Sequence, residues 1–363
     1  MVRILHAADF HLDSPFRGLT PRQARQRRAE GRGALKRLAD FADAGGVDLV
    51  LLAGDLFDSG EIYRETAQAL AEALGTLRGR VFIAPGNHDF WDAGGPYGSV
   101  DWPDNVHIFK TEQIEAVEVP EKNCVVYGAA FTAPECTGDP LGSFRAPEDG
   151  RLHLMVLHGD TEGGGRYRPI RKEEIAASGL DYLALGHIHA CSGLQYAGRT
   201  AWAYPGCPEG RGFDECGRRG VLMGTVDKGT ADLRFVAFGR RKYEILTVDS
   251  TGRDALAAAE AALEGRHTAE DVYRIVFTGE APADGIDAEH IRQALEERFY
   301  ALEVRDETRI ARDLWEGARE DSLRGAFLRR LQLRRDAAQT EEERLAVDRA
   351  ARWGLAALEN REL

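Results

Sequence analysis

The stretch Val2-Arg-Ile-Leu-His-Ala-Ala-Asp-Phe-His11 joins a β-rich apolar run to an Asp-x-His pair, and this arrangement recurs along the chain. Four further apolar runs are each followed by a polar cluster. The clusters are Gly54-Asp55, Gly86-Asn87-His88-Asp89, His158-Gly159-Asp160 and Gly186-His187-Ile188-His189. Because sites in open α/β sheets form at the carboxyl ends of the strands, these segments can converge in space although they are scattered in sequence.

The apolar runs alternate with helical stretches through the first half of the chain, which predicts an α/β fold with a sheet covered on both faces. We expect strands at 2–8, 48–53, 81–84, 124–128, 152–157 and 182–185, with helices at 22–44 and 62–77. From about residue 194 strands follow one another without helices, at 220–226, 231–238 and 243–248.

A second unit follows a break at 249–252. A helix at 255–263, a strand at 273–278, a helix at 288–298 and a strand at 300–304 predict a small α+β domain. The tail is expected to be helical, and Thr340 with Glu343 forms a capping box that starts its last helix. The expected domains are therefore 1–245, 246–309 and 310–363.

Composition excludes several classes of protein. The chain has 363 residues, 43% of them hydrophobic, so it is not disordered, and no run approaches the ~20 apolar residues that cross a bilayer. The net charge of −13 excludes binding of nucleic acid by bulk electrostatics. Five cysteines without a Cys-x-x-Cys pair indicate neither a disulfide framework nor a structural zinc site. Asp9 interrupts the apolar run that an export signal needs, so we expect a cytoplasmic protein without a membrane partner.

The polar clusters together favour a dinuclear metal site. Each alone has a structural alternative, since a strand-end Asp often caps a turn and Gly-Asn favours turn geometry. Together they offer imidazoles, carboxylates and an amide oxygen, which are too many ligands for one ion and suit Mn, Fe or Zn. Two ions about 3.5–4 Å apart, bridged by a carboxylate, form a clamp for in-line attack on phosphorus.

In this order the five motifs resemble the calcineurin-like metallophosphoesterase superfamily over about residues 1–245. More narrowly, residues 6–16, Gly54-Asp-Leu-Phe-Asp58 and Tyr204-Pro-Gly-Cys-Pro-Glu-Gly210 resemble the SbcD-type (YhaO-like) DNA repair exonucleases. The resemblance implies a four-layer α-β-β-α sandwich, followed by a small α+β cap domain and a helical tail.

The resemblance also implies roles for individual residues. The ligand set is Asp9, His11 and His189 for one divalent ion, Asn87, His158 and His187 for the other, and Asp55 as the bridge, with Mn²⁺ the expected metal. His88 is expected to stabilise the developing charge and to protonate the leaving oxygen. Asp89 is expected to orient His88.

One position departs from the archaeal and eukaryotic relatives of SbcD. Those proteins carry a second histidine three residues after the bridging Asp, whereas this chain has Asp58, as several bacterial members do. The endonuclease behaviour of those relatives is therefore not carried over to this chain.

A basic segment follows the first metal motif. Residues 17–37 hold eight Lys/Arg and one Glu, and Arg22, Arg25 and Arg28, with Arg168 from a second basic cluster, are candidate contacts to a phosphate backbone. The alternative is a solvated helix face. Trp91, Tyr97 and Trp102 could stack on bases, but packing is the favoured interpretation.

Three functions remain open. The first is a metal-dependent DNA exonuclease acting in DNA repair with an SbcC-type coiled-coil ATPase, for which the resemblance also implies a homodimer. The second is a phosphodiesterase for small substrates such as cyclic nucleotides, although the ~115 residues beyond the catalytic domain exceed what a small-molecule pocket needs. The third is a DNA-end-binding scaffold with weak hydrolysis, which would not require the full ligand set or His88. The tail either docks the ATPase or forms a hairpin packed on its own domain.

Overall fold

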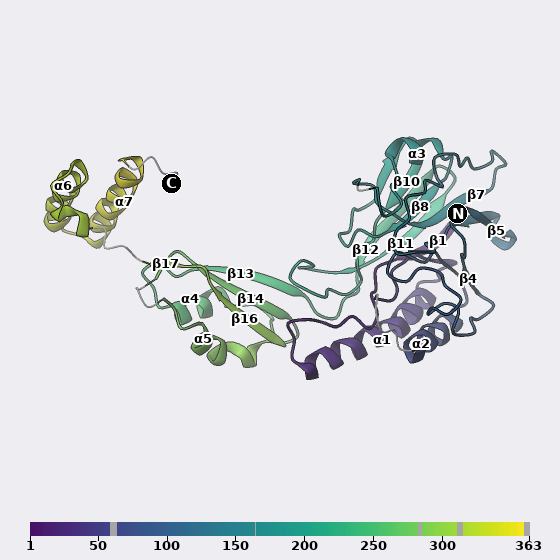
Figure 1. The fold of residues 1–363 in the computed structure, drawn as a ribbon, viewed down its shortest axis with the longest axis horizontal. Coiled ribbons are helices and arrows are strands. Elements are labelled where there is room, and N and C mark those ends of the chain that lie inside the picture. Colours follow the sequence, from purple (N-terminus) through teal and green to yellow (C-terminus); the bar gives the residue numbers. More distant parts are fainter. Residues whose placement is uncertain (59–63, 164, 282–284, 311–314, 359–363) are drawn as a thin grey trace. The chain divides into compact units, whose positions relative to one another are not determined.

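The structure is a computed structural model that describes residues 1–58, 64–163, 165–281, 285–310 and 315–358 (Figure 1). The chain separates into two compact units. The first comprises Met1–Ile245, His267–Arg274 and Leu295–Glu303, and the second comprises Leu246–Arg266, Ile275–Ala294 and Val304–Leu363. The three-domain division expected from the sequence stays a prediction.

The first sheet has six strands in the order β12-β11-β1-β2-β3-β4. Four strands run parallel: β1 (Val2–Ala7), β2 (Leu49–Leu52), β3 (Arg80–Ile83) and β4 (Val106–Ile108). The hairpin of β11 (Gly220–Asp227) and β12 (Thr230–Ala237) adds to β1 in the antiparallel direction.

The second sheet also has six strands, in the order β5-β6-β7-β8-β10-β9. Its parallel centre consists of β6 (Cys124–Gly128), β7 (Leu152–His158), β8 (Tyr182–Gly186) and β10 (Thr200–Ala203). The edges are the antiparallel strands β5 (Glu115–Val119) and β9 (Gln195–Ala197).

The two sheets pack face to face, and the alternation of buried side chains along the strands shows why. Leu49 and Leu51 of β2 share one core with Leu154 of β7, which places that core between the sheets. The intervening residue Val50 faces a second core with Leu38 of α1 (Pro21–Ala44) and Leu70 of α2 (Arg64–Gly75). Met155 and Leu157 of β7 face a third core with α3 (Lys172–Ala177). The expected four-layer α-β-β-α sandwich is therefore confirmed (Figure 1).

Helix α1 lies on the first sheet because its sequence provides both a start signal and an apolar stripe. Thr20 accepts a hydrogen bond from the Gln23 amide, the Gln23 side chain accepts one from the Thr20 amide, and Pro21 occupies the first turn. Leu35 and Leu38 are buried on the face turned to the sheet. The helix leaves Arg22 and Arg25 exposed, whereas Arg27 is buried with Glu30 on the other side.

The remaining elements form a small sheet and a helical hairpin. Strands β13 (Tyr243–Asp249), β14 (Val272–Thr278) and β16 (Ala301–Asp306) form a three-stranded sheet, and β15 (Glu280–Ala281) pairs with β17 (Arg309–Ile310). Helices α4 (Ala255–Ala262) and α5 (Ala288–Leu295) belong to the second unit. In the tail, α6 (Leu323–Ala337) and α7 (Glu341–Leu358) bury Leu328 and Leu355 against each other. The predicted capping box is present, since Thr340 and Glu343 exchange hydrogen bonds.

Several boundaries differ from the sequence prediction. The helix expected at 62–77 begins at Arg64 in the described part, with residues 62 and 63 outside it, and ends at Gly75. The helix expected at 288–298 is α-helical to Leu295 and continues as a 3₁₀ turn over Glu296–Arg298. The short elements β4, β5, α3, β9 and β10 were not expected, because polar residues interrupt or flank them and none has the wholly apolar run that marks β2. Among the described helices, none is long and apolar enough to span a membrane.

Candidate metal centre

The five polar clusters lie at the carboxyl ends of five strands. Asp9 and His11 follow β1, Asp55 follows β2, and the turn at 86–89 follows β3, all in the first sheet. His158 ends β7 and His187 follows β8, both in the second sheet. Because the sheets pack face to face with these ends at one edge, segments that are far apart in sequence meet there.

The first group of ligand atoms comes from Asp9, His11 and His189, which all lie within 4.8 Å of one another. The Nε2 atoms of His11 and His189 are 3.2 Å apart. The carboxylate of Asp9 is fully buried and accepts a hydrogen bond from the amide of His187. This contact ties the end of β1 to the end of β8.

The second group comes from Asp55, His158 and His187, again within 4.8 Å. Oδ1 of Asn87 lies 3.0 Å from Nε2 of His158 and 3.2 Å from Nδ1 of His187. Oδ2 of Asp55 lies 3.3 Å from His158 Nε2 and 3.7 Å from His11 Nε2, so this carboxylate stands between the two groups. The seven residues expected as ligands are therefore brought together.

The donor set fits divalent cations. Burial lowers the pKa of His11 and of His187 to about 4, so both rings are neutral and offer lone pairs. Nδ1 of His189 lies 2.7 Å from Glu215 and Nδ1 of His158 lies 2.9 Å from the carbonyl of Ala53. Hydrogen bonds of this kind orient metal-binding histidines and leave Nε2 for the ion. The nitrogen and oxygen mixture suits first-row metals.

The carboxylates of the site have displaced pKa values. Burial raises the pKa of Asp9 to about 6, although His158 and His189 partly offset it. Burial also acts on Asp55, but the imidazoles of His158, His11 and His88 outweigh it and hold the pKa of Asp55 below its usual value. Buried groups with opposed shifts in one cleft are typical of functional sites.

The backbone is strained where the ligands sit. Asp9, His11, Asp55 and His187 have φ values of 55°, 43°, 51° and 108°, in the left-handed region that L-residues avoid. Gly54 allows the sheets to approach closely, because a Cβ on it would lie 2.5 Å from Nδ1 of His158. Such strain persists only where the surrounding structure imposes it, and it clusters at functional sites.

His88 lies beside the ligands, and its ring contacts Asp58. Nδ1 of His88 is 3.3 Å from Oδ1 of Asp58, and Oδ2 of the same carboxylate accepts a hydrogen bond from the Ser14 hydroxyl at 2.7 Å. The interaction with Asp58 raises the pKa of His88. The His88 side chain is 35% exposed, so a substrate can reach it. The sequence marked Asp58 only as a departure from the relatives and gave it no role.

Asp89 has a different set of contacts from the expected one. Its buried carboxylate accepts hydrogen bonds from the amides of Leu56 and Gly86 at 2.7 Å and from the Tyr97 hydroxyl at 2.6 Å. These bonds hold the loop after β2 against the turn after β3. Tyr97 is 2% exposed and accepts a hydrogen bond from Trp102 at its carbonyl, so packing, the favoured interpretation, describes both rings.

The four candidate arginines divide into two kinds. Arg22 and Arg25 are exposed and Arg28 is half-buried on α1. Arg168 is fully buried: it donates to the carbonyls of Ala129 and Ala130 and lies 4.6 Å from the centre of the Phe131 ring. The expectation that Arg168 contacts substrate is therefore corrected, because its guanidinium is used inside the protein.

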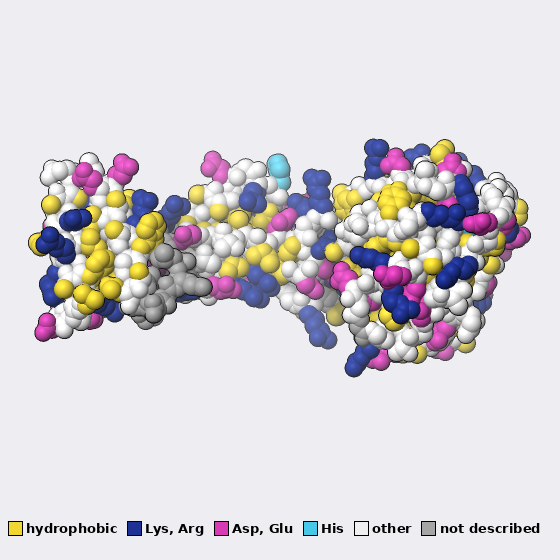
Figure 2. Space-filling model, turned by 90° about the horizontal axis from the view of Figure 1, so that it is seen from above, with side chains coloured by type: hydrophobic (Ala, Val, Ile, Leu, Met, Phe, Trp, Pro, Cys, Tyr) yellow, Lys and Arg dark blue, Asp and Glu magenta, His cyan; other side chains and the backbone are white. Residues whose placement is uncertain are grey.

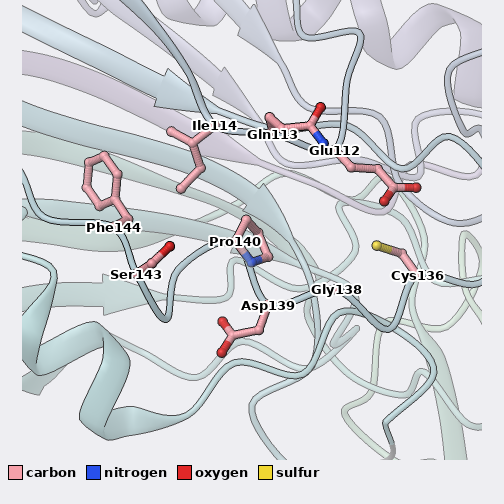
Figure 3. A pocket seen from close by; sticks show the side chains of 9 residues that line it. All are labelled: Glu112, Gln113, Ile114, Cys136, Gly138, Asp139, Pro140, Ser143 and Phe144. Carbon is pink, nitrogen blue, oxygen red and sulfur yellow. The ribbon is translucent and has the colours of Figure 1, made fainter.

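A hollow of about 380 Å³ lies next to Arg168, through Cys136, whose Sγ is 3.8 Å from the guanidinium (Figure 3). Glu112 and Asp139 also line it, and Figure 3 shows Ile114, Pro140 and Phe144 around it. No residue expected for the metal site lines this hollow. The hollow is therefore separate from the ligand cluster.

Comparison with known proteins identifies the family. A family model described as calcineurin-like phosphoesterase matches residues 2–191, more than half of the chain and all five polar clusters. The chain belongs to the calcineurin-like phosphoesterase family. As a member of this family, it is a metal-dependent phosphodiesterase of the hydrolase class, and the two ligand groups are among its candidate sites for divalent ions, together with a third group formed by His11, Asp58 and His88.

Three relatives of this phosphoesterase are informative. The "Uncharacterized metallophosphoesterase YhaO" of Bacillus subtilis (strain 168) is 31% identical over 334 residues, which cover 84% of this chain and 81% of the relative. The D subunit of the nuclease SbcCD from the same organism is 26% identical and covers 60% of this chain and 64% of the relative. The "DNA double-strand break repair protein Mre11" of Methanopyrus kandleri is 24% identical and covers 68% of this chain and 57% of the relative.

Proposed function

We propose that this phosphoesterase is a DNA exonuclease that hydrolyses phosphodiester bonds in DNA repair, with Mn²⁺ as its metal and an SbcC-type ATPase as its partner. The observation that carries the proposal is the meeting of two ligand groups at Asp55 with His88 beside them. The names of two relatives, one a nuclease and the other a DNA double-strand break repair protein, support DNA as the substrate. A cytoplasmic location and a homodimer are part of the same proposal.

The residues of this chain supply defined parts of the chemistry. The two ions, when bound, supply positive charge at the phosphoryl oxygens and make a water nucleophilic. Asp55 holds the two ligand groups together. The interaction with Asp58 raises the pKa of His88, so the ring is protonated and delivers a proton to the leaving oxygen. The positive charge of the ring also stabilises the pentacoordinate transition state.

The arginines of helix α1 support the proposal that the substrate is a polyanion. Arg22, Arg25 and Arg28 make no ion pair with any residue in the described part of the chain. Arg25 and Arg28 line a hollow of about 450 Å³ together with Arg32. Arg32 is 2.8 Å from Asp13, which follows the ligand His11 by two residues, so α1 contacts the loop that carries this ligand. Unpaired cations on a helix that contacts this loop favour contacts with phosphates of a strand.

Exposed apolar side chains of the helical tail support the proposal of a protein partner. Leu333 of α6 and Trp353 of α7 are 69% and 62% exposed, although both lie in a hairpin with its own buried core. Figure 2 shows hydrophobic side chains gathered on the surface of this hairpin. We propose that the hairpin docks an SbcC-type ATPase. The observed packing of α6 on α7 is compatible with docking, because the exposed side chains are not used in that packing.

The decisive experiment uses protein stripped of metal and re-supplied with Mn²⁺, tested on end-labelled duplex and single-stranded DNA. Cyclic AMP and bis(p-nitrophenyl) phosphate are assayed in parallel, with Asp55→Asn as the control. We expect DNA cleavage by the wild type and none by the variant. Turnover of cyclic AMP without DNA cleavage would instead favour the small-substrate phosphodiesterase, and DNA binding without turnover would favour the scaffold.

A further inference from the structure

The guanidinium of Arg211 lies beside the ligand His189 and uses only part of its hydrogen-bonding capacity. Nη2 is 2.8 Å from Oε1 of Glu215 and Nε is 3.4 Å from Oε2 of the same carboxylate. Nη2 also lies 3.1 Å from Nδ1 of His189. In the part of the chain that the structure describes, Nη1 has no acceptor, and it is not among the buried polar atoms that lack a partner. Nη1 therefore reaches the solvent.

The protonation of His189 leaves Arg211 further unsatisfied. A ring that binds a metal through Nε2 carries its proton on Nδ1, and that proton goes to Glu215 at 2.7 Å. Nδ1 then cannot accept a hydrogen bond from Arg211. A guanidinium has five N–H donors, and Glu215 takes one from Nε and one from Nη2. Both N–H groups of Nη1 and one of Nη2 are left for another acceptor.

The position of Arg211 determines which acceptor this is. The imidazole of His189 separates the guanidinium, on the Nδ1 side, from the ligand atom Nε2, which faces His11. Arg211 is thus one ring away from the ligand atom that would hold an ion against the scissile phosphate. The acceptor is therefore an anionic group next to the reacting one.

We propose that Arg211 binds the phosphate adjacent to the scissile phosphodiester and so selects polynucleotides over isolated diesters. This inference rests on the proposed function, because only a polynucleotide carries such a neighbour. A guanidinium suits it, since its planar fork pairs with phosphate oxygens.

The fork is held in place before substrate arrives. Glu215 is 3% exposed and bonds the amide of Arg211 at 2.7 Å as well as its side chain. Arg27 of α1 donates to the carbonyl of the preceding residue, Gly210, at 2.9 Å. Such pre-organisation lowers the entropy cost of binding the second phosphate.

The test compares the dinucleotide TpT, which has a single phosphodiester, with the trinucleotide TpTpT, in which each phosphodiester has a neighbour. The variants are Arg211→Gln, Arg211→Lys and the matched control Arg218→Gln, an exposed arginine of the same segment. We expect Arg211→Gln to lower the TpTpT-to-TpT ratio of kcat/KM roughly tenfold, mainly through KM, as loss of one charge-assisted hydrogen bond does. Arg211→Lys should recover part of the ratio because it keeps the charge without the fork, and Arg218→Gln should keep the wild-type ratio.

Direct binding supplies a second readout. Anisotropy of a labelled oligothymidylate, measured in a His88→Ala background so that the strand is cleaved only slowly, should show weaker binding for Arg211→Gln. The slope of log Kd against log salt should fall by about 0.7, the value for one neutralised phosphate of a single strand.

The outcomes separate the inference from the proposed function. A wild-type ratio kept by Arg211→Gln overturns the Arg211 subsite alone. An equal decrease on TpT and TpTpT, with a lower metal content, also overturns it and shows that Arg211 acts only through Glu215 and His189. A wild type that hydrolyses bis(p-nitrophenyl) phosphate but neither nucleotide overturns the proposed function, and the subsite with it.

Discussion

At the scale of single residues, the two carboxylates near His88 have separate tasks. Asp58 contacts the His88 ring at 3.3 Å and is partly exposed. Asp89 is buried among backbone amides and the Tyr97 hydroxyl. A carboxylate that contacts the reacting group affects turnover, whereas one that satisfies buried donors affects stability. We therefore expect substitution of Asp58 to affect turnover and substitution of Asp89 to affect stability.

We expect His88→Ala to keep both metals and to lower kcat by about 10²–10⁴, the usual loss for a general acid. Metal content measured by atomic spectroscopy, together with kcat on bis(p-nitrophenyl) phosphate, checks this. Loss of the metals in His88→Ala would assign the ring to the ligand set instead.

Asp58→Asn should lower kcat by about 10–100-fold with little change in thermal stability, because it weakens the hold on the His88 ring. Asp89→Asn is the matched comparison, and we expect it to lower the free energy of unfolding by roughly 1–3 kcal/mol. Denaturant unfolding and steady-state kinetics, measured on both variants, check these two expectations. A reversed pattern, with Asp89→Asn reducing only turnover, would restore the orienting role expected from the sequence.

At the scale of elements, α1 is joined to the rest of the first unit by buried ion pairs. Glu30 lies 2.6 Å from Arg241 and 3.0 Å from Arg27. Arg27 also donates to Gly210, and the Arg241 guanidinium lies 3.7 Å from the centre of the Tyr300 ring. Burial opposes ionisation of Glu30, but the two arginines outweigh it and lower its pKa to about 2.

This shift predicts an acid-dependent part of the stability. Because the pKa of Glu30 is lower in the folded state than in the unfolded one, its contribution is complete above about pH 4.3, the ordinary Glu value, and is lost as the pH falls towards 2. Glu30→Gln should lower stability at pH 7 and flatten the decline between pH 5 and 2. Urea unfolding at several pH values measures the free energy of unfolding of both proteins. If the stability of Glu30→Gln declined between pH 5 and 2 as steeply as that of the wild type, the prediction would be wrong.

The exposed side of α1 gives a second prediction at this scale. Arg25→Gln with Arg28→Gln should weaken binding of single-stranded DNA and reduce its salt dependence, with the slope falling by about 0.7 for each phosphate that the variant no longer neutralises. The control is Arg78→Gln, whose side chain is 91% exposed. Equal binding by the double variant and the control would mean that the arginines of α1 are only a solvated face.

At the scale of the whole molecule, metal binding should stabilise the folded chain. An ion that binds only the folded state adds about 2.7 kcal/mol at a concentration of 100 Kd. Mn²⁺ should therefore raise the Tm of the metal-stripped wild type in scanning fluorimetry. Asp55→Asn removes the carboxylate between the two ligand groups and should abolish most of the shift. An equal shift in both proteins would place the stabilising ion elsewhere.

The helical hairpin gives a second prediction at this scale. Leu333→Ala with Trp353→Ala should reduce co-purification with an SbcC-type ATPase, because both side chains are exposed and apolar. Phe235→Ala, which removes an exposed apolar side chain from β12, is the control. Cleavage of short oligonucleotides should remain in the double variant and in the control. Undiminished co-purification would place the ATPase contact on another surface.

The sequence by itself determined the α/β class and the placement of the polar clusters at strand ends, while the four-layer sandwich and the ligand set were implied by the family resemblance. Apolar strands followed by polar side chains are local patterns, and parallel strands bring their carboxyl ends to one edge, so Asp9, Asp55 and His158 could be expected to meet. The capping box at Thr340 could also be predicted from the sequence, because it depends on two residues that are three positions apart. Strands such as β5 and the helix α3 were missed, since their few apolar residues are mixed with polar ones and form no clear run or period.

Only the tertiary structure decided which side chains support the ligands. Asp58 contacts the His88 ring, Glu215 orients His189, and Arg168 is buried instead of facing substrate. These partners lie 30, 26 and 38 residues apart along the chain, counting Arg168 to the Ala130 carbonyl. Such pairings follow from how loops at the edges of two packed sheets fit together, which no local pattern of residues encodes.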